Sequence, residues 1–334
     1  MKSKTIVFTK VNTAELLERD VAAPGAGEVL VKLHTTTISS GTERANITGE
    51  LNVSIGPCTE VVFPRISGYS STGTVEAVGE GVTSLKVGDR VCCSWTVHSQ
   101  YVVKNEVDVS KLPDSISFSE GALFHIATFP LAAIRKCRVE LGESAIVMGM
   151  GVLGMCAVQL LRAAGAAPVI AADPVAEKRE LALRLGADYA LDPFDPDFAE
   201  TVRSLTGGGA KAAIEVTGNG KALDEVLDCM AKFGRVALLG CTRHSDFTID
   251  YYHKVHGPGI TLIGAHTLAR PETESHPGWW TTRDDREAII RLTELGRLRL
   301  GQLVSETHSP AECYEVYTRL VNEKAFPVVQ FDWS

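Results

Sequence analysis

The sequence lacks several features that mark whole classes of protein. No two of its eight cysteines form a C-x-x-C pair, so neither a zinc ribbon nor a thioredoxin-like redox motif is indicated. The longest apolar run, residues 145–161, is shorter than the roughly 20 residues that cross a bilayer. The apolar stretch before Lys10, TIVF, is too short for the core of a signal peptide. We therefore expect a soluble, cytoplasmic protein whose cysteines are mostly buried and reduced.

Positive charge is also scarce. Lys plus Arg number 33 against 41 for Asp plus Glu, which leaves a net charge of −8. No local basic patch offsets this excess, so nucleic acid and anionic membrane surfaces are not expected partners. With 45% apolar and 22% charged residues the composition is that of a globular protein, and 334 residues at about 150 per domain predict two domains.

Two textures divide the chain. Up to about residue 120, short runs rich in Val, Ile and Thr are broken by Gly and Pro, which predicts strands. From there to about residue 270, strand-like runs alternate with helical patterns, which predicts βαβ units on a parallel sheet. The last part holds two helical stretches and a final strand-like run, PVVQFD. We expect an α/β domain over 121–269, and a discontinuous β-rich domain formed by 1–120 and 270–334.

The most informative motif is a G-x-G-x-x-G that begins at Gly149. It follows the apolar run SAIVM and opens the helical run VLGMCAVQLLRAAG, which is the context that dinucleotide binding requires. Gly149 permits a tight turn, Gly151 lets the backbone approach a pyrophosphate, and Gly154 lets the helix pack closely on the strand. Unpaired N–H groups at the helix start, Val152 and Leu153, face the phosphates. The sequence therefore predicts a dinucleotide site.

Asp173 predicts which dinucleotide is bound. It ends the strand-like run PVIAAD, nineteen residues after Gly154, where a carboxylate can accept both hydroxyls of the adenosine ribose and repels a 2′-phosphate. NAD is therefore expected rather than NADP, although Lys178 or Arg179 could alter the choice by reaching the ribose. Other cofactor contacts are expected at the carboxyl ends of later strands, from Val216, Thr217 and Gly240.

Four further segments carry a resemblance over essentially the whole chain: SGTE at 40–43, GYSSTGTV at 68–75, GEGV at 79–82 and VGDRV at 87–91. With the glycine motif they resemble the medium-chain dehydrogenase/reductase superfamily of zinc-type alcohol, sorbitol and threonine dehydrogenases. The resemblance implies a GroES-like catalytic domain and a Rossmann NAD-binding domain. It also implies a homodimer paired through the last Rossmann strand, GITLIGA, whose exposed edge would otherwise favour aggregation.

The metal-binding positions depart from the zinc-dependent pattern. Where zinc-dependent members carry Cys-Gly-Thr-Asp this chain has SGTE, and where they carry Gly-His-Glu it has Gly-Tyr-Ser. Ser40 and Tyr69 are poor zinc ligands. His125, which aligns with a Glu that can serve the metal in polyol dehydrogenases, is the one good candidate left. The four-cysteine lobe of the structural zinc is absent as well. We predict a zinc-free member, with residual metal binding through His125 and Glu43 as the alternative.

Without a metal to acidify an alcohol, a side chain must take its proton. The resemblance places His125, Tyr69 and Thr42 in the active cleft. The ordinary pKa of histidine suits a base, although His125 could equally be a core residue. Tyr69 would need a lowered pKa, or could merely fill the space of the metal. Thr42 matches a hydroxyl that relays protons in the family.

Polar and aromatic side chains elsewhere in these segments are candidates for substrate contacts: Glu43, Arg44, Trp95 and His266. Glu43 and Arg44 could instead form a structural ion pair. The pair Trp279-Trp280 is expected in a lid, a dimer contact or a substrate platform. Three more histidines are expected on the surface: His98, His253 and His256.

Together these residues favour an NAD-dependent dehydrogenase that oxidises a secondary alcohol of a polyol, sugar, glycoside or cyclitol, or reduces the ketone. Two alternatives remain. The loss of metal ligands is also what a catalytically silent NAD-binding protein would show. A zinc-free quinone or enone reductase is the other, but such enzymes usually prefer NADPH, against which Asp173 argues.

Overall fold

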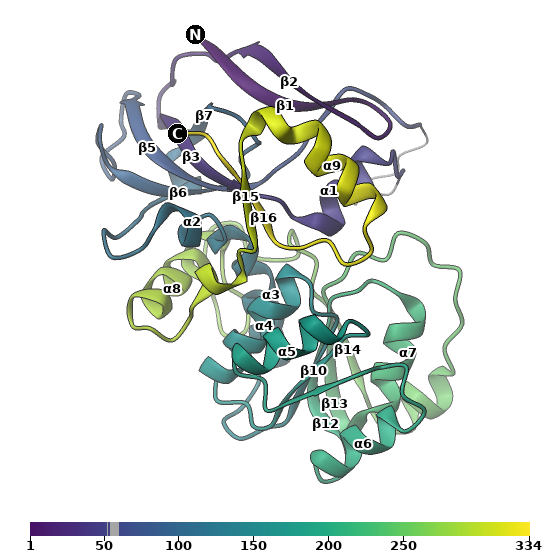
Figure 1. The fold of residues 1–334 in the computed structure, drawn as a ribbon. Coiled ribbons are helices and arrows are strands. Elements are labelled where there is room, and N and C mark those ends of the chain that lie inside the picture. Colours follow the sequence, from purple (N-terminus) through teal and green to yellow (C-terminus); the bar gives the residue numbers. More distant parts are fainter. Residues whose placement is uncertain (52, 54–59) are drawn as a thin grey trace. The chain divides into compact units, whose positions relative to one another are not determined.

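The computed structural model describes residues 1–51, 53 and 60–334. The chain divides into two compact units, the first made of Met1–Ile126 and Arg286–Ser334 and the second of Ala127–Asp285 (Figure 1). The second boundary lies later than the expected 269. It does so because the segment after 269 is held by the second unit: the Arg135 guanidinium lies 3.5 Å from the Trp280 ring and donates to Asp285 at 2.8 Å.

The described residues of the first unit form two β-sheets. A three-stranded sheet has the order β2-β1-β4, and a larger one runs β15-β16-β3-β5-β6-β8 with β7 also paired to β3. The last strand returns to the start of the chain, since Phe331 of β16 pairs with Thr36 of β3. The strands are β1 (Lys2–Lys10), β2 (Thr13–Asp20), β3 (Glu28–Thr37), β4 (Arg65–Ile66), β5 (Ser70–Val78), β6 (Arg90–Ser94), β7 (Tyr101–Asn105), β8 (Val109–Lys111), β15 (Glu306–His308) and β16 (Val329–Asp332).

Helices and two apolar clusters complete the first unit. Its helices are α1 (Ser40–Ile47), α2 (Phe118–Gly121), α8 (Thr282–Glu294, which starts in the second unit) and α9 (Cys313–Asn322). One cluster joins α9 to β1 and β16 through Phe8, Tyr317 and Phe331. The other follows alternate residues of β3, because side chains two apart on a strand share a face. The helix α1, which carries Thr42, packs against α9 and β1.

The second unit is a six-stranded parallel sheet with helices, in the order β11-β10-β9-β12-β13-β14. Its strands are β9 (Ala145–Met148), β10 (Val169–Ala172), β11 (Tyr189–Leu191), β12 (Ala210–Glu215), β13 (Met230–Leu238) and β14 (Thr261–Gly264). Its helices are α3 (Phe124–Cys137, which starts in the first unit), α4 (Val152–Ala163), α5 (Ala176–Arg184), α6 (Phe198–Leu205) and α7 (Gly220–Asp228). This order reverses at β9, as in a Rossmann fold, and confirms the predicted fold class.

One element of the second unit differs from the sequence pattern. The helical pattern over 220–234 ends early, at Asp228, because Met230 pairs with Ala210 and joins the core of the sheet. Tertiary packing here outweighs helix propensity.

Across the described residues, six of seven cysteines are buried and all are free, with Cys241 exposed and Cys58 outside the described residues. Within the same residues, no helix combines the length and apolarity of a membrane span.

Candidate active site

The three glycines of the loop after β9 differ in what a side chain would meet there. Gly149 has φ +99°, and a Cβ there would lie 2.7 Å from the Thr217 methyl. A Cβ on Gly154 would lie 1.9 Å from the carbonyl oxygen of Gly149, so α4 could not pack on the strand. Gly151 differs from both, because a Cβ there would meet no atom within 4 Å. The fold itself does not require glycine at 151, which leaves an open space beside the backbone.

The N-terminus of α4 opens beside Gly151. The helix has Gly151 as its N-cap, with no side chain accepting from its first N–H groups. Uncapped N–H groups and the positive end of the helix dipole together favour an anionic group such as a pyrophosphate. Val152 and Leu153, both predicted cofactor contacts, form this first turn. The open space at Gly151 and the uncapped turn fit a dinucleotide.

Asp173 lies at the end of β10 beside the glycine loop. Its carboxylate accepts from the backbone N–H of Met150 at 2.7 Å and from that of Val175 at 2.9 Å. Each carboxylate oxygen keeps a further lone pair for a ribose hydroxyl. Arg179 does not use its charge on this carboxylate: it donates to the carbonyl of Asp173 at 2.7 Å and to Asp192 at 3.2 Å.

The carboxyl ends of β12 and β13 meet next to the glycine loop. Besides the methyl of Thr217, the side chain of Val216 would touch a Cβ on Gly149, at 3.1 Å. A Cβ on Gly240 would lie 2.2 Å from the N of Gly218, so the two strand ends are in close contact. The structure thus brings the predicted residues of three strand ends together. Sequence reasoning missed Glu215, whose buried carboxylate organises this turn by accepting from Thr217 N at 2.7 Å. Burial raises its pKa.

His266 follows the end of β14, as expected. Its Nδ1 accepts from Leu268 N at 3.2 Å, so the ring is held by its own turn. Burial, and then the charges of Arg243 and Lys136, lower the pKa of His266, so the neutral ring is favoured. A neutral imidazole keeps its second nitrogen as a donor.

In the first unit three predicted side chains form one aromatic cluster. The His125 ring, at the start of α3, lies 4.5 Å from the Trp95 ring and 5.8 Å from the Tyr69 ring, both edge-to-face. The rings of Tyr69 and Trp95 are 6.3 Å apart. Tyr69 and Trp95 are half-buried and His125 is buried. The three come from different segments, which converge at this point.

Trp95 holds an unusual backbone conformation. Its φ is +56°, which is rare for a bulky residue and costs of order 1–3 kcal/mol. The strain is held by neighbours: Trp95 N donates to Tyr69 O at 2.8 Å, and Trp95 O accepts from Lys104 Nζ at 3.1 Å. Residues with a strained backbone concentrate at functional sites. The strain therefore supports a functional role for this cluster.

The structure corrects the expectation that Glu43 and Arg44 contact substrate or each other. Glu43 has no exposed surface; its carboxylate accepts from Ser39 N at 2.8 Å, from His98 Nε2 at 3.0 Å and from the Tyr317 hydroxyl. Arg44 instead donates to the carbonyls of Leu320 and Glu323 at the end of α9. Both side chains hold the fold. Thr42, between Gly41 and Glu43 on α1, stays half-buried.

The expectation that His98 lies on the surface is wrong. His98 is 1% exposed, with Nδ1 2.7 Å from Thr36 Oγ1. Its ring bonds Glu43 and packs edge-to-face against the rings of Tyr317 and Phe331. Gly68 makes room for this ring, since its φ is +101° and a Cβ there would lie 2.8 Å from His98 Cδ2. His253 and His256 are exposed, as predicted.

The donors at the zinc positions do not fit a catalytic zinc. The chain offers a hydroxyl at Ser40 and a phenol at Tyr69, and the Glu43 carboxylate is engaged by three donors in the core. Catalytic zinc needs three protein ligands from Cys, His or carboxylates. Outside 52 and 54–59, no group of three such side chains converges in a way that could hold a metal.

Comparison with known proteins places this architecture in a family. Residues 25–138 match the alcohol dehydrogenase GroES-like domain, and residues 152–276 match the zinc-binding dehydrogenase domain. The chain belongs to the medium-chain dehydrogenase/reductase superfamily of zinc-type alcohol dehydrogenases, which confirms the resemblance. The matched domains are those of nicotinamide-dependent alcohol dehydrogenases, so the dinucleotide that fits the glycine loop is a nicotinamide cofactor.

Individual relatives are distant but cover nearly the whole chain. The chain is 28% identical over 348 residues to an L-threonine 3-dehydrogenase of Pyrococcus horikoshii, with 94% of each sequence covered. It is 26% identical over 340 residues to a D-guloside 3-dehydrogenase of Escherichia coli K12, with 96% of each covered. Its fold matches an alcohol dehydrogenase of Escherichia coli CFT073 solved with NADH, at a TM-score of 0.83 and 20% identity over 99% of both chains.

Proposed function

We propose that the protein is an NAD-dependent dehydrogenase that oxidises a secondary alcohol of a polyol, sugar, glycoside or cyclitol, or reduces the corresponding ketone, without zinc. The observation that carries this proposal is the cluster of Tyr69, Trp95 and His125. It offers a phenol, an imidazole and an indole within ring contact of one another, in segments where the family holds metal and substrate. A hydroxylated substrate suits such a surface, because aromatic faces stack on sugar rings while the phenol bonds a hydroxyl.

The protein's own groups then perform the proton transfer. NAD, when bound, accepts a hydride from the carbinol carbon. The Tyr69 hydroxyl, on the more exposed ring, holds the substrate oxygen, and the His125 imidazole takes the proton from that oxygen. Thr42 carries the proton onward through its hydroxyl. General-base catalysis of this kind typically contributes about 10²–10⁴-fold.

The donor set supports zinc independence. A hydroxyl at Ser40 and a phenol at Tyr69 replace the thiolate and imidazole that zinc prefers. The nearby carboxylate, Glu43, is held in the core by Ser39, His98 and Tyr317. We assign no step to a metal.

The choice of NAD rests on Asp173. Its buried carboxylate, with one free lone pair on each oxygen, suits the two ribose hydroxyls and repels a 2′-phosphate. Arg179, which could alter this choice by reaching the ribose, is held by Asp173 O and Asp192. The names of the relatives fit a hydroxylated substrate, since one acts on threonine and another on a guloside.

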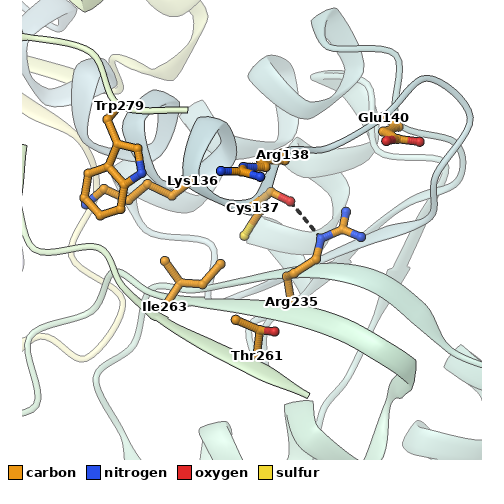
Figure 2. Close-up of a pocket in the computed structure, with 8 residues that line it drawn as sticks. All are labelled: Lys136, Cys137, Arg138, Glu140, Arg235, Thr261, Ile263 and Trp279. Atoms are coloured by element: carbon orange, nitrogen blue, oxygen red, sulfur yellow. Dashed lines mark hydrogen bonds between the residues drawn. The ribbon is translucent and has the colours of Figure 1, made fainter. Parts of the chain in front are cut away.

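We further propose a homodimer formed through β14. This strand is at the edge of its sheet, so its outer N–H and C=O groups have no strand partner in the described chain. A hollow of about 460 Å³ lies beside it, lined in part by Thr261 and Ile263 of β14 and by Trp279 (Figure 2). Lys136 Nζ stands 4.6 Å from the Trp279 ring. A second copy would pair with the strand and cover the hollow. Ile263→Lys should then yield monomers in sedimentation velocity.

We propose a cytoplasmic location from the state of the cysteines. Six buried free thiols, with the pKa of Cys92 raised to about 11 and that of Cys156 to about 12 by burial, suit a reducing cytoplasm.

The test is NADH formation by chelator-treated protein with NAD, against a panel of sugars, sugar acids, glycosides and cyclitols. Turnover that survives the chelator supports a zinc-free dehydrogenase. Turnover that is lost and returns only with zinc contradicts the donor argument. Tight NADH binding without turnover of any panel member would instead favour the catalytically silent protein. Reduction of quinones or enones with NADPH would favour the reductase.

A further inference from the structure

A buried polar network in the first unit has no place in the proposed proton transfer. At its centre is the Glu43 carboxylate, which accepts from the backbone of Ser39, from the ring of His98 and from the hydroxyl of Tyr317. The network extends to Thr36, whose Oγ1 lies 2.7 Å from His98 Nδ1 and accepts from Trp333 Nε1 at 3.0 Å. All these side chains are less than one-tenth exposed.

The network has its donors and acceptors satisfied. Burial and the adjacent carboxylate raise the pKa of Tyr317 well above its ordinary range, so Tyr317 keeps its proton and donates it to Glu43. A buried carboxylate with three donors is stable where an unpaired one is not. The network is therefore a rigid element of the unit.

The network joins two segments that carry proposed active-site residues. Glu43 fixes the start of α1 by accepting from Ser39 N, and Thr42 precedes it in the same turn. His98 fixes the segment 67–70: its N donates to Ser67 O at 3.0 Å, and its ring packs where Gly68 leaves room.

The second segment carries Tyr69 directly. Tyr69 follows Gly68, and its carbonyl accepts from Trp95 N at 2.8 Å. The segments 39–43 and 67–70 are also those at which zinc-dependent members of the family carry metal ligands. In those relatives the metal joins the two segments through its ligands. In this chain Ser40 and Tyr69 stand at the ligand positions, and their side chains are poor zinc ligands.

We propose that Glu43 is a positioning residue, which acts through His98 and Tyr317 to hold the segments bearing Thr42 and Tyr69 in their working geometry. The network does by hydrogen bonds what metal–ligand bonds do in zinc-dependent relatives. This inference rests on the proposed function, because that proposal assigns Thr42 and Tyr69 to the substrate. Misplacement of a reacting group by about 1 Å can cost about 10²-fold in rate.

The test compares Glu43→Gln with Val316→Ala. Gln keeps the shape but presents an amide donor to one of the three donors. Val316 lies next to Tyr317 on α9 in the same apolar cluster, so its truncation destabilises the same region without touching the network. Should Glu43→Gln not fold, Tyr317→Phe removes one donor and leaves the carboxylate with two.

Two measurements are made on each variant. Hydrogen exchange follows the amides of Trp95 and His98, which are bonded to Tyr69 and Ser67. Kinetics follow kcat and KM on the best alcohol of the panel, with NADH affinity measured separately. For Glu43→Gln we expect exchange at these amides about tenfold faster than in Val316→Ala at matched loss of melting temperature. We also expect kcat about 10–100-fold lower, with NADH affinity within about twofold of the unmodified protein.

Each outcome decides a part of the proposal. Equal exchange in the two variants shows that Glu43 is only a core residue and overturns the proposal. Faster exchange with unchanged kcat overturns the positioning role alone. If the unmodified protein oxidises no alcohol, the proposed function fails and the positioning role fails with it. The exchange comparison then still decides whether the network joins the two segments.

Discussion

Substitution of Gly151 by alanine separates cofactor binding from folding. The backbone at Gly151 has φ −79° and ψ −172°, which an L residue adopts without strain, and a Cβ there meets nothing within 4 Å. The folded protein should therefore accept the methyl group at a change of less than about 1 kcal/mol in its free energy of unfolding. The new methyl group would, however, occupy the space that a pyrophosphate needs. We expect NADH affinity to fall at least tenfold, which is about 1.4 kcal/mol.

Gly154→Ala is the opposite case and serves as the contrast. A Cβ there would lie 1.9 Å from the backbone oxygen of Gly149, so either the loop or α4 must shift. We expect a loss of stability of roughly 1–3 kcal/mol, the range of an overpacked core. Gly301→Ala, whose Cβ would meet only the Glu120 side chain at an ordinary 3.5 Å, is the control for an alanine that the fold accepts.

The assays are urea unfolding and titration of NADH by its fluorescence. Unchanged stability with weakened NADH binding, seen in Gly151→Ala alone, supports a pyrophosphate site in the open space beside Gly151. Full NADH affinity in Gly151→Ala would refute it, because the methyl group and a pyrophosphate cannot occupy the same space.

Four further predictions concern single side chains. Asp173→Asn should weaken NAD binding about tenfold and reduce the preference of the protein for NAD over NADP. The dissociation constants of the two cofactors measure this preference. An unchanged ratio of the two constants would contradict the assignment of Asp173 to the ribose. Tyr69→Phe should lower kcat about 10²-fold, whereas His125→Gln should remove the acid limb of the kcat/KM pH profile; an intact limb would exclude His125 as the base. Hydrogen bonds from Arg319, then His308, lower the pKa of Glu306 to about 2, so its stabilising effect is present above its unfolded pKa near 4.5 and is lost as pH falls from about 4.5 to 2. Glu306→Gln should flatten this part of the stability curve in acid titrations of unfolding; equal slopes would count against the pairing.

The parts of the fold that the sequence predicted are those set by neighbouring residues. The turn at Gly149 and the packing at Gly154 lie within six residues of each other, so their spacing carries the geometry. The strand order around β9 follows from repeated βαβ units of one hand. The polar strand β2, by contrast, has no alternating pattern; it is held by pairing with β1 and by packing against α9, where Ala14 joins the apolar cluster.

The roles of the misassigned residues are set by contacts between distant parts of the chain. Glu43 and Arg44 stand in a polar segment that suits a substrate pocket, and only the position of α9 shows that both bind the core. His98 has neighbours Val97 and Ser99, which give no sign of burial. Its partner Glu43 is 55 residues away, so no local pattern could join them.

The difference between Gly68 and Gly151 is one that only the folded chain shows. Both glycines leave room beside the backbone, but at Gly68 the room is filled by His98 and at Gly151 it is open. A glycine whose space is filled from within the chain supports folding, and one whose space stays open supports binding. In the positioning role that we propose, the first kind contributes to the site as well. Here the ring that fills the space at Gly68 also bonds Glu43, and so ties the segment that carries Tyr69 to the helix that carries Thr42.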